Sequence, residues 1–143
     1  MQRIDVDTDR IRTSVWTNGP EDGVPVLLIH GNLCTGRFWQ DVANKLPKQL
    51  SVAAPDLRGF GRTEPKPIDA TRGLDDWTDD VESLVRALGW EGKQLHVGAW
   101  SMGGGTRRYS GSSWVSSRPS CRARKRRSAP LSRNGSASRA AVS

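Results

Sequence analysis

A serine with a small residue two positions away on each side is the strongest candidate for chemistry in this chain. The stretch VGAWSMGGG over residues 97–105 has the pattern of a buried strand that runs into a tight turn at Ser101. A serine hydroxyl is a weak nucleophile at neutral pH until a base accepts its proton and an acid orients that base. Ser101 is therefore a candidate nucleophile that needs two partners.

The sequence after Ser101 supplies neither partner. Residues 102–143 contain no Asp, Glu or His. His96 lies five residues earlier on the same predicted strand, about 16 Å away at roughly 3.3 Å per residue. The arginines that follow the serine stay protonated in proteins, so they cannot act as the base. We therefore predict negligible turnover for this chain as it stands.

Strands and helices alternate along the first 105 residues. Alternating apolar and polar residues indicate two half-exposed strands at 2–6 and 10–17. Runs of consecutive apolar residues indicate strands buried on both faces, and apolar spacings of three to four residues indicate helices whose other face is wet. The predicted strands cover residues 2–6, 10–17, 24–31, 50–54 and 94–100, and the predicted helices cover 37–46 and 74–88. This alternation predicts an α/β fold with a mostly parallel sheet covered by helices.

Three short motifs follow the predicted buried strands in order. They are LLIHGN at 27–32, PDLRGFGRT at 55–63 and AWSMGGG at 99–105. With these motifs, residues 1–105 resemble the N-terminal part of an α/β-hydrolase, a family with an HG oxyanion loop, a D-x-R-G-x-G-x-S/T loop and a G-x-S-x-G nucleophile elbow. The resemblance implies ester-type acyl transfer on a small apolar substrate, with no cofactor and no metal.

The resemblance also implies a role for each matching residue. Ser101 would be the nucleophile, and the backbone N–H of Met102 would donate to the oxyanion together with that of Asn32 or Leu33. The residues that support the nucleophile elbow and the pocket would be His30, Gly31, Ala99, Trp100 and Gly103.

For several of these residues the alternative is a purely structural role. His30 is expected to pack beneath the oxyanion loop rather than to act as the base. Ala99 stands where the family usually has glycine, and it is small enough for the turn. Trp100 and Met102 would line the acyl pocket or simply pack.

The D-x-R-G-x-G motif is expected to have a structural role. Its residues Asp56, Arg58, Gly59 and Gly61 are expected to form a hydrogen-bonded turn at the pocket edge.

Asn32 resembles the halide-contacting asparagine of haloalkane dehalogenases. Those enzymes use an aspartate where this chain has Ser101, so dehalogenation is not expected.

The composition changes abruptly after Gly105. Residues 1–105 hold all 15 acidic residues and 12 of the 22 lysines and arginines, a formal charge of −3, whereas residues 106–143 carry +10. The second part has three Val, Leu or Ile residues, too few to offset the entropy lost on ordering. We predict a partial α/β-hydrolase domain over 1–105 and a disordered Arg/Ser-rich tail over 106–143. A reading-frame shift in GC-rich coding DNA is one hypothesis for the break.

Two other functions stay open. The basic run RARKRR at 122–127 would attract nucleic acid or another anionic surface without sequence specificity. A non-catalytic, hydrolase-like domain that binds a ligand is the second alternative. In the family the strand at 94–100 has neighbours on both sides, so here it is expected to leave one sheet edge bare.

The location is predicted from what the sequence lacks. The N-terminal stretch MQRIDVDTDR has no apolar signal-peptide core. No run approaches the roughly 18 apolar residues of a membrane span. Cys34 and Cys121 suggest neither a disulfide framework nor a metal site. These features predict a cytoplasmic protein, and they leave the substrate and the oligomeric state open.

Overall fold

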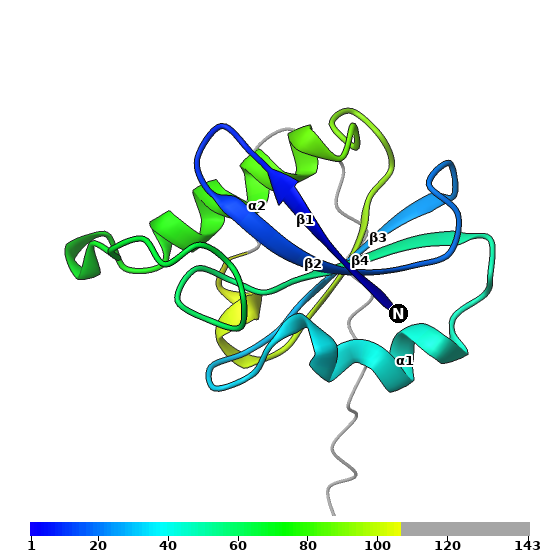
Figure 1. Ribbon diagram of the computed structural model, residues 1–143, viewed down its shortest axis with the longest axis horizontal. Helices are drawn as coiled ribbons and strands as arrows, with labels where there is room; N and C mark the ends of the chain where they lie inside the picture. The colour runs from blue at the N-terminus through cyan, green and yellow to red at the C-terminus, as the bar shows by residue number, and fades with distance from the viewer. Residues whose placement is uncertain (107–143) are drawn as a thin grey trace, which may run out of the picture.

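Five strands form one mixed sheet in the order β1-β2-β4-β3-β5 (Figure 1). The computed structural model describes residues 1–106, so the predictions for the rest of the tail, including the basic run, lie outside the described residues. The strands are β1 (Gln2–Asp7), β2 (Arg12–Asn18), β3 (Val24–Ile29), β4 (Leu50–Pro55) and β5 (His96–Ala99). β3 pairs in parallel with β4 and β5, whereas β1–β2 and β2–β4 are antiparallel. The predicted α/β class is confirmed, with a sheet that is parallel on one side.

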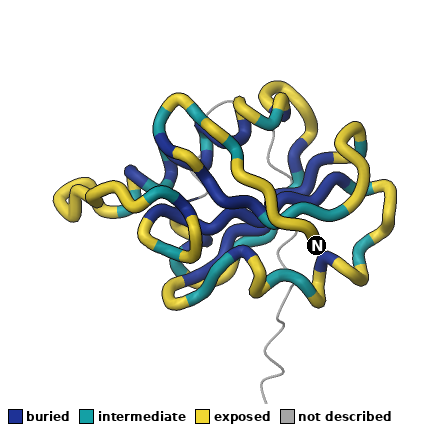
Figure 2. Tube along the Cα trace, in the orientation of Figure 1, coloured by how far each residue is buried: buried dark blue, intermediate teal, exposed yellow. Residues whose placement is uncertain are grey.

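One helix covers each face of the sheet. Helix α2 (Asp75–Ala87) packs Val81, Leu84 and Val85 against Leu27 and Ile29 of β3. Helix α1 (Gln40–Lys45) packs Ala43 on the opposite face, against the alternate β3 residues Val26 and Leu28. Because side chains alternate across a strand, the apolar run of β3 supplies both cores. Figure 2 shows the buried central strands beside the exposed β1.

The first predicted helix is shorter than expected. The segment 37–46 begins as a 3-10 helix, η1 (Gly36–Trp39), and becomes α-helical only in α1. Two apolar residues of the predicted helix, Phe38 and Val42, are 49% and 44% exposed, and the smaller Ala43 is buried instead. The buried side chain of α1 that packs against the sheet is therefore Ala43.

Other boundaries move for local reasons. β2 starts at Arg12, since Thr8 closes a turn by donating its hydroxyl to the carbonyl of Ile11. β5 is confined to four residues because it pairs only with Val26–Ile29 of β3. Within residues 1–106 it forms one edge of the sheet, as predicted. The helix predicted at 74–88 is confirmed as α2, preceded by the short 3-10 helix η2 (Ala70–Arg72).

No helix within residues 1–106 has the length and apolar content needed to cross a bilayer.

Candidate active site

Ser101 lies at a strained turn between β5 and the 3-10 helix η3 (Ser101–Gly104). Its φ is +51°, a left-handed conformation that is unfavourable for a residue with a Cβ atom. Strain of this kind amounts to about 1–3 kcal/mol and persists only where the surroundings impose it. Here the N–H of Trp100 donates to the carbonyl of Ile29 at 3.0 Å, and that of Gly103 donates to the carbonyl of Trp100 at 3.0 Å. The turn leaves the Ser101 side chain exposed.

Two glycines allow this turn to sit tightly on β3. A Cβ atom on Gly103 would lie 2.5 Å from the His30 carbonyl oxygen and 2.7 Å from that of Ile29. A Cβ atom on Gly31 would lie 2.9 Å from Cβ of Ser101. The segment after β3 therefore touches the serine directly. Ala99 fits in β5 opposite Ile29, where it is partly buried.

The β3 loop, residues 30–35, carries the second strained residue. Leu33 has a φ of +59° and is 91% exposed. Its N–H donates to Oδ1 of Asn32 at 3.0 Å, so one of the two predicted second oxyanion donors is occupied within its own loop. The N–H of Met102 lies in the first turn of η3, where backbone N–H groups have no partner inside the helix.

His30 uses both ring nitrogens for hydrogen bonds. It is fully buried, and its Nε2 accepts from the Leu57 N–H at 3.0 Å, so the proton sits on Nδ1 and is donated to the Gly31 carbonyl at 2.7 Å. Burial lowers the pKa of His30, against the opposing effects of the Gly31 hydrogen bond and the charge of Asp56. This arrangement supports the packing role over that of a base. The other histidine, His96, pairs with Val26 at the far end of β5 from Ser101.

The D-x-R-G-x-G motif forms the β4 loop, residues 56–63, and the predicted hydrogen-bonded turn is present. The Phe60 N–H donates to the Leu57 carbonyl at 2.9 Å. Gly59 and Gly61 have φ values of +81° and +57°, which glycine adopts freely.

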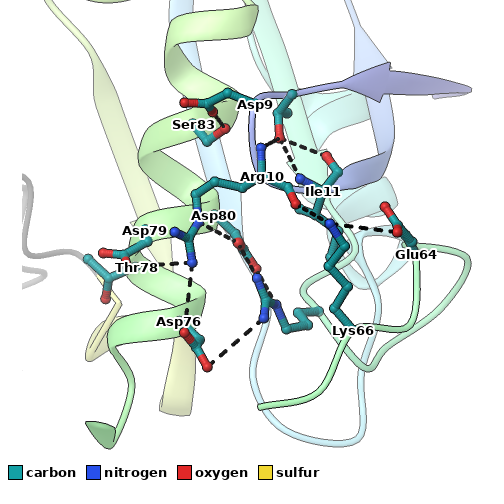
Figure 3. Close-up of polar contacts among 12 residues, drawn as sticks. Asp9, Arg10, Ile11, Glu64, Lys66, Asp76, Thr78, Asp79, Asp80 and Ser83 are labelled. Atoms are coloured by element: carbon teal, nitrogen blue, oxygen red, sulfur yellow. Dashed lines mark hydrogen bonds and ion pairs between the residues drawn. The ribbon is translucent and has the colours of Figure 1, made fainter. Parts of the chain in front are cut away.

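Arg58 anchors the β4 loop to α2 through a buried ion pair. Its Nε and Nη2 donate to the two carboxylate oxygens of Asp80, both at 2.8 Å. Arg10, from the β1–β2 turn, donates Nε to the same carboxylate at 3.0 Å and lies within 4 Å of Asp76 and Asp79 (Figure 3). These contacts tie three segments of the chain together.

The polar side of α2 was predicted to face water, and in part that prediction is wrong. Asp76 and Asp80 are each 6% exposed. They are buried because the β1–β2 turn and the β4 loop pack on this side of the helix and supply arginines. The signal in the sequence was Asp at 76, 79 and 80, on one helical stripe, but the arginines that pair with it are distant along the chain.

Two exposed aromatic side chains, Trp100 and Phe38, lie beside the turn at Ser101. Trp100 is 57% exposed, and its ring centroid lies 6.3 Å from that of Phe38. Its Cδ1 would be 3.1 Å from a Cβ atom on Gly31, so the indole borders the β3 loop. Met102, by contrast, packs against the core on the α2 side of the sheet. Of the two predicted pocket residues, Trp100 is therefore available at the surface and Met102 contributes to packing.

The family follows from comparison with known proteins. A model of the alpha/beta hydrolase family matches residues 26–139, and the chain belongs to that family. The match continues past Gly105, where the composition changes.

Curated relatives and solved structures agree with this assignment. A 2-hydroxymuconate semialdehyde hydrolase from Pseudomonas sp. is 36% identical over 98 residues, which are 66% of this chain and 33% of that protein. A soluble epoxide hydrolase from Corynebacterium sp. is 41% identical over 71 residues, 48% of this chain and 23% of that one. A thermophilic esterase from Thermogutta terrifontis superposes with a TM-score of 0.61 at 32% identity, over 73% of this chain and 38% of the esterase. The chain thus spans a third or less of the length of these curated relatives.

Proposed function

We propose that Ser101 is the nucleophile of an acyl-transfer site that hydrolyses small apolar esters. The observation that carries this proposal is the strained turn, with φ of +51° at an exposed serine between a strand and a helix. A nucleophile elbow has this geometry because it lifts the hydroxyl clear of the sheet. An elbow without a nucleophilic role would have no need to retain the strain.

The oxyanion donors in this proposal are the N–H groups of Met102 and Asn32. Met102 follows the serine at the start of η3, and Gly31 brings the β3 loop against Ser101. Asn32 is favoured over Leu33 because the Leu33 N–H is already bonded to the Asn32 side chain. A single donor of this kind contributes roughly 3 kcal/mol to stabilising the transition state.

The proposed substrate class follows from the surface beside the serine. Trp100 and Phe38 present apolar rings next to the β3 loop. A small ester with an apolar acyl or alcohol group would bury surface there on binding. Esterases and epoxide hydrolases both occur among the similar proteins. We propose ester chemistry because serine attack on a carbonyl generates the oxyanion that the two N–H groups would stabilise.

We propose further that this chain alone has negligible turnover. Both ring nitrogens of His30 are engaged, and His96 lies at the other end of β5. No Asp, Glu or His follows Ser101 in the sequence. No base then assists the attack of Ser101 or the later attack of water on an acyl-enzyme. Slow stoichiometric acylation of Ser101 without rapid release is the expected result.

Labelling with a fluorophosphonate probe tests both statements. Intact mass and peptide mapping should find one adduct, located on Ser101, and added imidazole as an external base should accelerate its formation. The Ser101→Ala variant should give no such adduct, whereas Ser51→Ala, which removes a buried hydroxyl, should label normally. Equal labelling of Ser101→Ala would refute the nucleophile. Fast hydrolysis of a nitrophenyl ester, dependent on Ser101 and without imidazole, would refute the inactivity of the chain.

A further inference from the structure

The β3 loop is held in a strained conformation by contacts inside and outside the loop. Leu33 adopts φ of +59° while its side chain is 91% exposed, so packing of that side chain contributes little. A strained backbone persists only where surrounding contacts over-determine it. Inside the loop, the Asn32 side chain accepts from the Leu33 N–H. The two ends of the loop are bonded to residues outside it.

The carboxylate of Asp56 provides one such contact. It is 2% exposed, and its Oδ1 accepts from the Gly36 N–H at 2.8 Å, directly after the β3 loop. Its Oδ2 accepts from the Arg62 N–H at 3.1 Å, inside the β4 loop. One buried carboxylate thus joins the two loops through backbone N–H groups, and hydrogen bonds to a charged acceptor are stronger than neutral ones.

The neighbouring residue holds the other end of the β3 loop. The N–H of Leu57 donates to Nε2 of His30, the first residue of that loop. The consecutive pair Asp56–Leu57 therefore fixes both ends of the β3 loop. Arg58, the next residue, is fixed in turn by its ion pair with Asp80 on α2.

Glycines make the approach to Asp56 close enough for these bonds. A Cβ atom on Gly36 would lie 2.1 Å from the carbonyl oxygen of Ala54, and one on Gly61 would lie 2.1 Å from Oδ2 of Asp56. Among the ion pairs within residues 1–106, none involves Asp56. Its charge is balanced by backbone dipoles rather than by an arginine or lysine.

We propose that Asp56 is a positioning residue, which holds the β3 loop so that the Asn32 N–H stays beside Ser101. The effect of Asp56 on catalysis rests on the proposed function, whereas the hydrogen bonds that hold the β3 loop do not depend on it. Asp56 touches neither the serine nor its hydroxyl in this role. It acts through the backbone of Gly36, and Leu57 and His30 secure the opposite end.

The Asp56→Asn variant separates this role from a general contribution to stability. Asparagine keeps the shape but offers one oxygen and one NH₂ group, so one of the two backbone N–H groups would face another donor. Asp76→Asn is the matched control. Asp76 is also buried and also accepts from a backbone N–H, that of Asp69 at 2.8 Å, but it lies on α2.

Amide hydrogen exchange followed by NMR is the first readout. In Asp56→Asn, the amides of residues 31–36 should exchange about tenfold faster relative to those of β3, as expected for the loss of a hydrogen bond to a charged group. In Asp76→Asn, residues 31–36 should keep their wild-type ratio. Equal ratios in the two variants would overturn the proposal.

Ser101 labelling is the second readout, and it distinguishes the two proposals. Asp56→Asn should label with the fluorophosphonate at least about tenfold more slowly than Asp76→Asn, because a displaced oxyanion donor no longer stabilises the transition state. If wild-type Ser101 does not label at all, the proposed function fails, and the exchange result still decides the role of Asp56. If labelling is normal in Asp56→Asn, the positioning role fails while the nucleophile stands.

A measurement on the wild-type chain covers the case in which Asp56→Asn does not fold. A hydrogen bond between the Gly36 N–H and Oδ1 transmits a scalar coupling from the Gly36 nitrogen to the carboxyl carbon of Asp56. This coupling should be detectable in a long-range HNCO spectrum of the labelled chain. Its absence, with couplings across the β3–β4 ladder present in the same spectrum, would overturn the proposal.

Discussion

Arg58 and Asp80 form a two-pronged ion pair in the interior, Nε to Oδ2 and Nη2 to Oδ1, each at 2.8 Å. Their side chains are 8% and 7% exposed. The hydrogen bond to Asp80 raises the pKa of the Arg58 guanidinium above its ordinary value, so the guanidinium stays charged. The contact fixes the β4 loop on α2, and the β4 loop in turn bonds to the β3 loop through the Leu57 N–H and His30.

Removing Asp80 should strongly destabilise the domain. Asp80→Ala leaves the Arg58 charge buried without its partner, and the free energy of unfolding should fall by about 3 kcal/mol. Urea denaturation measures this loss. Asp5→Ala breaks surface ion pairs with Arg3 and Arg12 and should change the free energy of unfolding by less than about 1 kcal/mol. Similar losses in the two variants would contradict the importance of burial.

A methyl group at position 103 should disrupt the turn at Ser101. In Gly103→Ala the new Cβ would meet backbone atoms of Ile29 and His30, which cannot move aside without shifting β3. We expect a loss of about 1–3 kcal/mol, typical of overpacking. Gly104→Ala, with no atom within 4 Å of the added Cβ, is the control and should be close to neutral in the same thermal melt. If both variants melt alike, the contact between η3 and β3 is looser than described.

Protonation of His30 should destabilise the fold in mild acid. Burial lowers its pKa in the native state, while the unfolded chain has the ordinary value of about 6.5. The native state then binds fewer protons, so stability is fully present above about pH 6.5 and is lost as the pH falls through the lower native pKa. Urea midpoints measured from about pH 7.5 down to about pH 5 should show this decline.

Two histidine variants show which residue causes that pH dependence. His96→Gln should retain the decline, because His96 lies outside the loop contacts. His30→Gln should be less stable overall but should lose the decline. The opposite pattern would place the titrating group on His96 instead.

Trp90 and Trp100 should contribute very differently to the stability of the fold. Trp90 is 5% exposed in the core on the α2 side, so Trp90→Ala should cost about 3–5 kcal/mol. Trp100 is 57% exposed, so Trp100→Ala should have a small effect on stability. If the proposed substrate site is correct, an aryl ester should compete with the fluorophosphonate and slow the labelling of Ser101. Trp100→Ala should make this competition weaker. Unchanged competition would remove Trp100 from that site.

Much of the fold could be predicted because its signals are local. The consecutive apolar residues of β3 and the helical spacing around Leu84 depend only on neighbours in the chain. The turn at Ser101 could also be predicted, since Gly103 and the small residues before the serine stand at fixed spacings from it. The boundaries of η1, α1 and β5 could not, because they depend on which side chain meets the sheet and how long β3 is.

The amino-acid pattern is enough to predict the fold class and the position of the candidate nucleophile, and residues 102–143 contain no Asp, Glu or His. Three features emerge only in the folded chain: Asp80 is buried against Arg58, both nitrogens of His30 are occupied, and Asp56 joins two loops. These contacts join residues 20 or more positions apart, or set the tautomer of a buried ring. Periodicity reports which face of an element is apolar, but hydrogen bonds between distant loops exist only once the sheet has brought those loops together.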